Sequence, residues 1–171
     1  EVEGKRITTE SIVIASGARP FIPPVPGLDG IDYLTSDTVW SLTELPPRLL
    51  VVGGGPIGCE LAQAFSRLGS KVTQVDMAAR IMPREDEDVS AAVSARFAAQ
   101  GIEVLTGHRL LKFETVDGEH FMEAEHQGET VRVAFDRVLL AIGRKANTEG
   151  FGLEEIGVAL TPQGTVEVNE Y

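Results

Sequence analysis

Short apolar runs alternate with amphipathic stretches through the middle of the chain. Residues 49–52 form a continuous apolar run, typical of a strand buried in a parallel sheet. Apolar residues then recur at helical spacing over 57–68 and again over 89–97. Further strands are predicted over 71–75 and 102–105. This β-α-β-α-β order is typical of a dinucleotide-binding unit.

The period of the pattern changes after this unit. Residues 109–115, 119–125 and 130–135 alternate between apolar and polar side chains, and Asp-Gly and Gln-Gly pairs between them predict hairpin turns. Residues 138–142 form one more apolar strand. We therefore expect an α/β fold, a Rossmann-like parallel sheet whose last crossover is a three-stranded antiparallel β-meander.

The two ends of the chain are organised differently. Residues 11–15 are β-branched and apolar, which predicts a buried strand. The segment 19–30 contains four prolines and two glycines, which predicts an extended connector at a domain boundary. The chain begins without Met and ends in an alternating, strand-like stretch over 165–171. We therefore expect it to be a piece of a longer protein.

Composition excludes several classes of function. Fifteen Lys and Arg against 26 Asp and Glu give a net charge of −11, which disfavours binding to nucleic acid or to anionic lipid. No apolar run approaches the ~20 residues of a membrane span. Cys59 is the single cysteine, so the chain cannot hold a disulfide or a two-thiol centre, and a cytoplasmic location is favoured. The three histidines share no metal-ligand spacing, and no metal site is predicted.

A glycine-rich loop with the pattern G-x-G-x-x-G follows the first strand of the central unit. The first glycine of such a loop allows a tight turn, the second lets the backbone approach a pyrophosphate, and the third permits close contact between helix and strand. The helix that opens within the loop directs free N–H groups at the same pyrophosphate. The loop consists of Gly53, Gly54, Gly55, Pro56, Ile57 and Gly58.

An acidic residue, Asp76, ends the next predicted strand, 23 positions after Gly53. A carboxylate here accepts hydrogen bonds from a ribose 2′-hydroxyl and repels a 2′-phosphate, so NAD(H) is favoured over NADP(H). Arg80 weakens this preference, since a nearby guanidinium can accommodate phosphate; its alternative role is to pair with Asp76 or with a loop carboxylate. The alternative for the whole motif is a glycine-rich turn that packs a helix on a sheet.

Three segments in order resemble one family. Residues 52–62 resemble the second nucleotide-binding fingerprint of the flavin-dependent pyridine nucleotide–disulfide oxidoreductases, which include dihydrolipoamide dehydrogenase, glutathione reductase and mercuric reductase. Residues 12–20 resemble the family's A-T-G crossover, with Ser16 in place of Thr, and 140–148 resemble the second crossover, with Ala146 where proline is common. The mercuric-reductase-like branch of the family has the most similar sequence.

The resemblance implies the place of this chain in a larger enzyme. Residues 1–39 would be the junction with the FAD domain and its Pro-rich connector, 40–144 the NAD(P)-binding domain, and 145–171 the return segment to the FAD domain. FAD, the dimerisation domain and a homodimer would belong to the whole protein. The family's C-x4-C redox pair and its His-Glu pair are absent from this sequence. No catalytic residue is therefore expected here, nor activity of the chain alone.

The same resemblance implies roles for single residues. Asp76 would bind the adenosine ribose, Leu110 would lie on the adenine side, and Glu60 would reach the nicotinamide carboxamide, although an exposed acid in the first helical turn explains Glu60 equally well. The loop 53–58 would bind the pyrophosphate, and Pro56 stands where some relatives carry a gating aromatic residue. The nicotinamide half would lie along Ala141, Ile142, Gly143 and Arg144, and FAD against Ala15, Ser16 and Gly17.

The sequence thus favours the NAD(H)-binding domain of an FAD-dependent pyridine nucleotide–disulfide oxidoreductase, which positions NADH for hydride transfer to the flavin. Two alternatives stay open. One is a flavin NADH oxidase or quinone reductase on the same scaffold, without the disulfide. The other is a non-catalytic module that senses NAD. Cys59, with no partner cysteine, is interpreted as a small buried hydrophobe and not as the redox cysteine.

Overall fold

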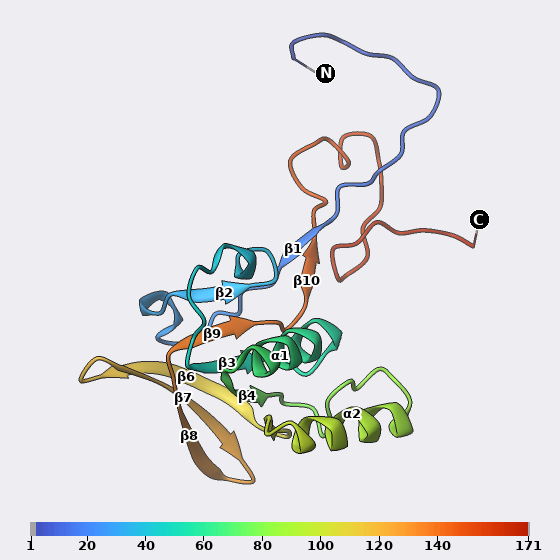
Figure 1. Ribbon diagram of the computed structural model, residues 1–171. Helices are drawn as coiled ribbons and strands as arrows, with labels where there is room; N and C mark the ends of the chain where they lie inside the picture. The colour runs from blue at the N-terminus through green and yellow to red at the C-terminus, as the bar shows by residue number, and fades with distance from the viewer. Residues whose placement is uncertain (1–2, 171) are drawn as a thin grey trace. The chain divides into compact units, whose positions relative to one another are not determined.

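The computed structural model describes residues 3–170 (Figure 1). Their contacts divide the chain into two compact units. One unit is Pro20–Arg144, and the other consists of the described residues before and after it. The first unit begins upstream of residue 40, where the sequence placed the start of the nucleotide domain, because Leu28 of the connector and Ile31 just after it contribute to its core.

In the unit Pro20–Arg144, five parallel strands form the central sheet in the order β2-β9-β3-β4-β5. The apolar runs of this unit lie in this sheet, and the predicted fold class is confirmed. The edge strand β2 is not predicted by the sequence, because three residues are too few to show a period. The strands are β2 (Tyr33–Thr35), β3 (Arg48–Val52), β4 (Lys71–Val75), β5 (Glu103–Leu105) and β9 (Arg137–Leu140).

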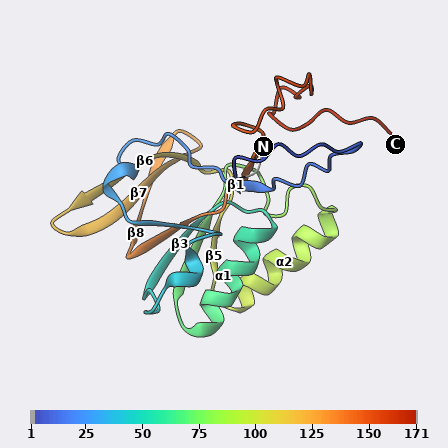
Figure 2. The same cartoon turned by 90° about the horizontal axis from the view of Figure 1, so that it is seen from above.

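Two α-helices cover one face of this sheet (Figure 2). Helix α1 (Pro56–Leu68) begins at a proline, which needs no N–H donor in the first turn. It ends at Gly69, which adopts φ 114° and donates its N–H to Phe65 and Ser66. Helix α2 (Glu87–Ala99) carries acidic residues in its first turn, where the helix dipole stabilises them. Neither helix, at 13 residues, is long enough for a membrane span, and the described residues contain no other candidate.

The opposite face is covered by the predicted meander, in which β6, β7 and β8 pair antiparallel in that order. Side chains of β3 alternate between the two faces: Leu49 and Val51 pack on the helices, whereas Leu50 and Val52 pack on the meander. The result is three layers, of helices, sheet and meander. The strands are β6 (Arg109–Val116), β7 (Glu119–His126) and β8 (Glu129–Phe135). Short 3-10 helices lie at Leu28–Gly30 and Val39–Ser41.

The second unit contains little regular structure. A two-stranded sheet pairs β1 (Ala18–Pro20) with β10 (Arg144–Ala146), and the residues of these strands other than Pro20 and Arg144 belong to this unit. Near it, the side chain of Asn147 donates to the carbonyl of Ser16 at 3.0 Å, and its backbone N–H donates to Gly17 at 2.9 Å.

Two strand predictions are wrong in this second unit. Residues 11–15 lie outside any strand, with Ile12 70% and Val13 89% exposed, because no described strand pairs with them. In the alternating stretch that begins at residue 165, the described part has one isolated bridge, from Leu160 to Val166, and no strand. An apolar run folds as a strand only where a neighbour supplies hydrogen bonds and cover.

Candidate functional site

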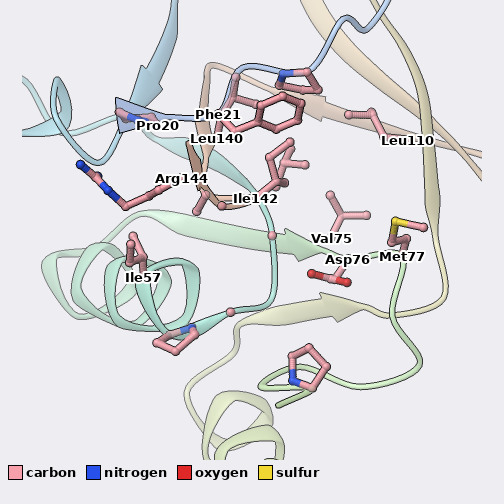
Figure 3. A pocket seen from close by; sticks show the side chains of 18 of the residues that line it. Pro20, Phe21, Ile57, Val75, Asp76, Met77, Leu110, Leu140, Ile142 and Arg144 are labelled. Carbon is pink, nitrogen blue, oxygen red and sulfur yellow. The ribbon is translucent and has the colours of Figure 1, made fainter. Parts of the chain in front are cut away.

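The carboxyl ends of three neighbouring strands meet at one edge of the sheet. Val52, the last residue of β3, is in register with Val75 of β4 and with Leu140 of β9. The residues that follow these three therefore lie side by side, at the edge where open α/β sheets bind their ligands. A cavity of about 800 Å³ opens there, within the unit Pro20–Arg144 (Figure 3).

The glycine loop forms one wall of this cavity, and two of its glycines lie against other backbone. Gly53 adopts φ 118°, and a Cβ atom on it would lie 2.3 Å from the carbonyl oxygen of Ala141. A Cβ atom on Gly58 would lie 2.1 Å from the carbonyl oxygen of Gly53. These are the tight turn and the close helix–strand contact that the motif predicts.

Gly55 has the opposite environment. A Cβ atom built on it would meet nothing within 4 Å, and the residue lines the cavity. Gly55 is also the N-cap of α1, and no side chain caps this helix end. The loop therefore offers an open cradle beside the N-terminus of α1, where N–H groups and the helix dipole favour an anion.

Asp76 lies beside the loop at the end of β4. Its Oδ2 accepts a hydrogen bond from the backbone N–H of Gly54 at 2.5 Å, and its Oδ1 accepts one from Ala78 at 2.6 Å. These bonds hold the carboxylate in the cavity wall. Figure 3 shows Met77 and Leu110 on the same side of the cavity as Asp76. One polar and two apolar side chains thus form the end where the resemblance places the adenosine.

Arg80 does not pair with Asp76 or with a loop carboxylate, so that alternative is wrong. Its guanidinium donates to four backbone carbonyls, those of Met82, Pro83, Glu85 and Asp86, at 2.9–3.5 Å. Local geometry explains this outcome, because the chain turns back around Arg80 and brings backbone carbonyls, and not carboxylates, within hydrogen-bond distance of its guanidinium. The bonds brace the loop between β4 and α2.

Another arginine of this loop was missed by the sequence reasoning. Arg84 lines the cavity, and in the described part of the chain no hydrogen bond or ion pair engages its guanidinium. The loop is attached to the glycine loop, because Met82 donates its N–H to the carbonyl of Gly54 at 2.6 Å. No pattern in the sequence identifies Arg84, because its place in the wall depends on how this loop folds back on the strand end.

The other end of the cavity is formed by the second crossover and the connector. The wall contains Ala141, Ile142, Gly143 and Arg144, the residues that the resemblance assigns to the nicotinamide half, and that role stays a prediction. The guanidinium of Arg144 donates to Ser36 Oγ at 2.9 Å and to Asp37 Oδ1 at 3.1 Å, which ties it to the segment after β2. The sequence reasoning missed the connector residues of the wall, because it treated their prolines only as a linker; they are Pro20, Phe21, Pro23 and Val25.

Some residues implied by the resemblance lie outside the cavity wall. Glu60 is an exposed residue of α1, and Gly54 and Gly58 face the protein interior more than the cavity. The segment 15–17 belongs to the other compact unit. The roles of Glu60 and of segment 15–17 stay predictions.

Cys59 is buried in α1, with 5% of its surface exposed. Burial raises the pKa of its thiol above the ordinary value, which disfavours the reactive thiolate. His108 and His126 stack with ring centroids 4.1 Å apart, and each Nδ1 lies within hydrogen-bond distance of a backbone carbonyl. Among residues 3–170, no group of three or more His, Cys, Asp or Glu side chains is arranged to hold a metal ion.

A comparison with known families matches residues 1–171 to the pyridine nucleotide-disulphide oxidoreductases. The chain belongs to this family. Among curated members, a mercuric reductase of Staphylococcus aureus is 39% identical over the whole chain, which covers 31% of that protein. A dihydrolipoyl dehydrogenase of Bacillus subtilis is 36% identical over 98% of the chain, which covers 36% of that protein. The chain thus spans about a third of the length of these pyridine nucleotide-disulphide oxidoreductases.

Solved structures agree with this family. The HOCl-induced flavoprotein disulfide reductase RclA of Escherichia coli superposes with a TM-score of 0.80 at 30% identity, over 90% of this chain and 35% of that one. The water-forming NADH oxidase of Lactobacillus brevis superposes with a TM-score of 0.75 at 28% identity, over 87% of this chain and 33% of that one. The predicted resemblance to the FAD-dependent pyridine nucleotide-disulphide oxidoreductases is confirmed.

Proposed function

We propose that this chain supplies the NAD(H)-binding domain of an FAD-dependent pyridine nucleotide–disulfide oxidoreductase, with residues 40–144 at its centre. A flavin bound in the whole protein, with residues 15–17 of this chain beside it, would accept hydride from the nicotinamide, and the whole protein would be a homodimer. This chain binds and orients the dinucleotide and excludes water from it. The observation that carries the proposal is one cavity with the cradle at Gly55 on one wall and the Asp76 carboxylate beside it.

The dinucleotide fits the groups in this cavity. Its pyrophosphate would bind the open cradle at the N-terminus of α1, where an anion is favoured. Its adenosine would lie between Met77 and Leu110, with the ribose hydroxyls toward Asp76. Its nicotinamide would lie along the segment 141–144, the opposite end of the wall.

Asp76 supports NAD(H) over NADP(H), and an engineered relative supports a role of this position in the choice of cofactor. A water-forming NADPH oxidase was made from the Lactobacillus brevis enzyme by five substitutions. They fall at an aspartate, at the two residues after it, at a proline seven positions later and at a glycine eighteen positions earlier. The same spacing in this chain gives Asp76, Met77, Ala78, Pro83 and Gly58.

Three of these five positions have the same residue type in this chain as in the NADH oxidase: the aspartate, the proline and the glycine. Asp76 and Pro83 line the cavity, and Gly58 packs under the glycine loop. The arrangement therefore favours NADH. Arg84 beside Pro83 is the feature that works against strict selectivity, since a free guanidinium attracts a 2′-phosphate.

Titration of the protein with NADH and NADPH, followed by nucleotide fluorescence, tests the proposal. We expect tighter binding of NADH, and a loss of about tenfold in Asp76→Ala, or about 1.4 kcal/mol. Glu129→Ala is the matched control, because it removes one negative charge from an exposed position at the start of β8. Absence of binding to either nucleotide would refute the proposal, and tighter NADPH binding would refute the preference.

A flavin NADH oxidase without the disulfide is the second candidate, favoured by the similarity to the Lactobacillus brevis enzyme. The whole protein distinguishes the two. NADH-dependent reduction of a disulfide or of Hg²⁺ without oxygen supports the disulfide class, whereas NADH-dependent oxygen consumption alone supports the oxidase. If the whole protein contained no flavin and oxidised no NADH, a module that senses NAD would be the better account.

A further inference from the structure

Gln74 is a polar side chain near the end of β4, next to the polar Thr73. It is fully buried, with 0% of its surface exposed, and Val72 and Val75 of the same strand are each 1% exposed. Burial of a side-chain amide is unfavourable unless hydrogen bonds replace those to water. The function proposed above assigns no role to Gln74. Its hydrogen-bond partners indicate its role.

The amide of Gln74 bonds to the glycine loop. Its Nε2 donates to the carbonyl oxygen of Gly53 at 2.8 Å and lies 3.6 Å from the sulfur of Cys59. In the described part of the chain, no backbone N–H donates to this carbonyl. Since a buried carbonyl needs a donor, Gln74 supplies the hydrogen bond that the loop cannot supply for itself.

The peptide unit between Gly53 and Gly54 is thereby held at both ends. Its carbonyl oxygen accepts from Gln74, and its N–H, on Gly54, donates to Asp76. The carbonyl and N–H of a trans peptide point in opposite directions. Gln74 lies in β4, and Asp76 is the first residue after this strand, so both side chains reach the peptide from the same strand end. Together they determine the orientation of this peptide.

The helix packs directly over this bond. A Cβ atom on Gly58 would lie 2.1 Å from the carbonyl oxygen of Gly53 and 3.1 Å from Nε2 of Gln74. A rotation of the peptide would move the carbonyl against the first turn of α1. The loop amides that follow, at the cradle of Gly55, depend on the same peptide for their direction.

We propose that Gln74 is a positioning residue of the dinucleotide site: its buried amide, together with Asp76, fixes the Gly53–Gly54 peptide and so aims the loop amides at the pyrophosphate. This inference rests on the proposed function. It assigns Gln74 no contact with the nucleotide, since the side chain acts from beneath the loop.

Substitution Gln74→Met in the full chain keeps the length of the side chain and removes its donor. We expect weaker binding of both NADH and ADP-ribose by about tenfold each, because both ligands carry the pyrophosphate. Thr73→Val is the control: it removes another side-chain hydrogen bond of β4, the part-buried one that Thr73 donates to Glu103 at 2.9 Å, away from the loop. Unchanged affinities in Gln74→Met, or a loss for NADH alone, would overturn the inference.

A second variant gives a readout that a merely structural role would not change. In Gln74→Glu an ionised carboxylate would face the carbonyl of Gly53, whereas a protonated carboxyl could donate to it. NADH affinity of this variant should therefore rise as the pH falls. Two other titratable groups lie close by: Cys59 beside the Gln74 amide, and Asp76 at the same peptide. Both are also present in Gln74→Met, so the pH dependence of NADH affinity is measured for Gln74→Glu and for Gln74→Met. The difference between these two pH profiles isolates the new carboxyl. Identical profiles would contradict the inference.

A measurement on the unchanged protein tests the inference even if the variants do not fold. The NMR signals of the Gln74 side-chain amide should shift when ADP-ribose is added, while those of Gln63, bonded to Gln100 at 2.8 Å, stay in place. Unshifted Gln74 signals in protein that binds ADP-ribose would overturn the inference alone. If the unchanged protein binds neither NADH nor NADPH, the proposed function itself is wrong.

Discussion

The carboxylate of Asp76 accepts a hydrogen bond from the backbone N–H of Gly54, and the N···O distance is 2.5 Å. This bond joins the glycine loop after β3 to the acidic residue after β4, two features that the sequence treats as separate signals. The second carboxylate oxygen accepts from Ala78, at the start of the next loop. Asp76 therefore has a structural role in the site in addition to its proposed contact with the ribose.

Asp76→Asn tests this double role. The asparagine amide offers one oxygen, so either Gly54 or Ala78 would face an NH₂ group instead of an acceptor. We expect the free energy of unfolding to fall by about 1–3 kcal/mol, the typical cost of an unsatisfied buried donor. Urea denaturation measures the change, and Glu129→Gln serves as the control. Equal stability of Asp76→Asn and the unchanged protein would show that the two backbone bonds contribute little.

Cofactor preference should be transferable at the same strand end. The combined variant Asp76→Ala, Met77→Arg and Pro83→Arg removes the carboxylate and adds two cations around the expected 2′-position. We expect the ratio of NADPH to NADH affinity to rise by about tenfold or more, because charge-assisted bonds to phosphate replace a repulsion. Nucleotide titration measures the ratio. Asp76→Ala alone is the control, and a combined variant that gains no NADPH affinity over it would place the 2′-position elsewhere.

A substitution at Gly55 should weaken nucleotide binding without affecting folding. A Cβ atom on Gly55 meets nothing within 4 Å, and its φ of −77° suits any residue, so Gly55→Ala should fold with unchanged thermal stability. The new methyl group would occupy the space expected for the pyrophosphate, and NADH affinity should fall by about tenfold or more. Gly30→Ala also meets nothing within 4 Å but lies outside the cavity wall. Normal NADH binding in Gly55→Ala would contradict the assignment of the cradle.

The ion pair of Arg48 with Asp136 should make stability sensitive to acid. Arg48 donates to Asp136 from its backbone N–H at 2.8 Å and from Nη2 at 2.6 Å, and these bonds lower the pKa of the Asp136 carboxyl below its ordinary value. A lowered pKa in the folded state stabilises the protein above the unfolded-state pKa, and this contribution is lost as the pH falls through the folded-state value.

Asp136→Asn should therefore be less stable than the unchanged protein at pH 7, and the difference should shrink as the pH falls below about 4, near the pKa of an unfolded aspartate. Urea denaturation over a pH series measures it. Asp29→Asn, in the short 3-10 helix Leu28–Gly30, is the control. A difference that stays constant with pH would show that the pair does not couple to protonation.

Local patterns in the sequence were enough to predict the architecture of the central unit. Continuous apolar runs indicated parallel strands, alternation indicated the meander, and the glycine loop with Asp76 indicated the dinucleotide edge. Each of these signals lies within one element or at its end, where side-chain period and backbone freedom act over a few residues. The same locality explains the wrong prediction at 11–15, whose composition suits a strand but which lacks a sheet partner.

Only the tertiary structure decided which distant groups share the site. The sequence determined that residues 53–58 form a turn into a helix, but not that Gln74 and Asp76 hold the Gly53–Gly54 peptide from both ends. It placed Arg80 near the cofactor, whereas the fold commits its guanidinium to loop carbonyls and leaves Arg84 in the wall. Hydrogen-bond partners depend on strand register and on how loops return, and both are fixed by packing across the sheet and not by local sequence.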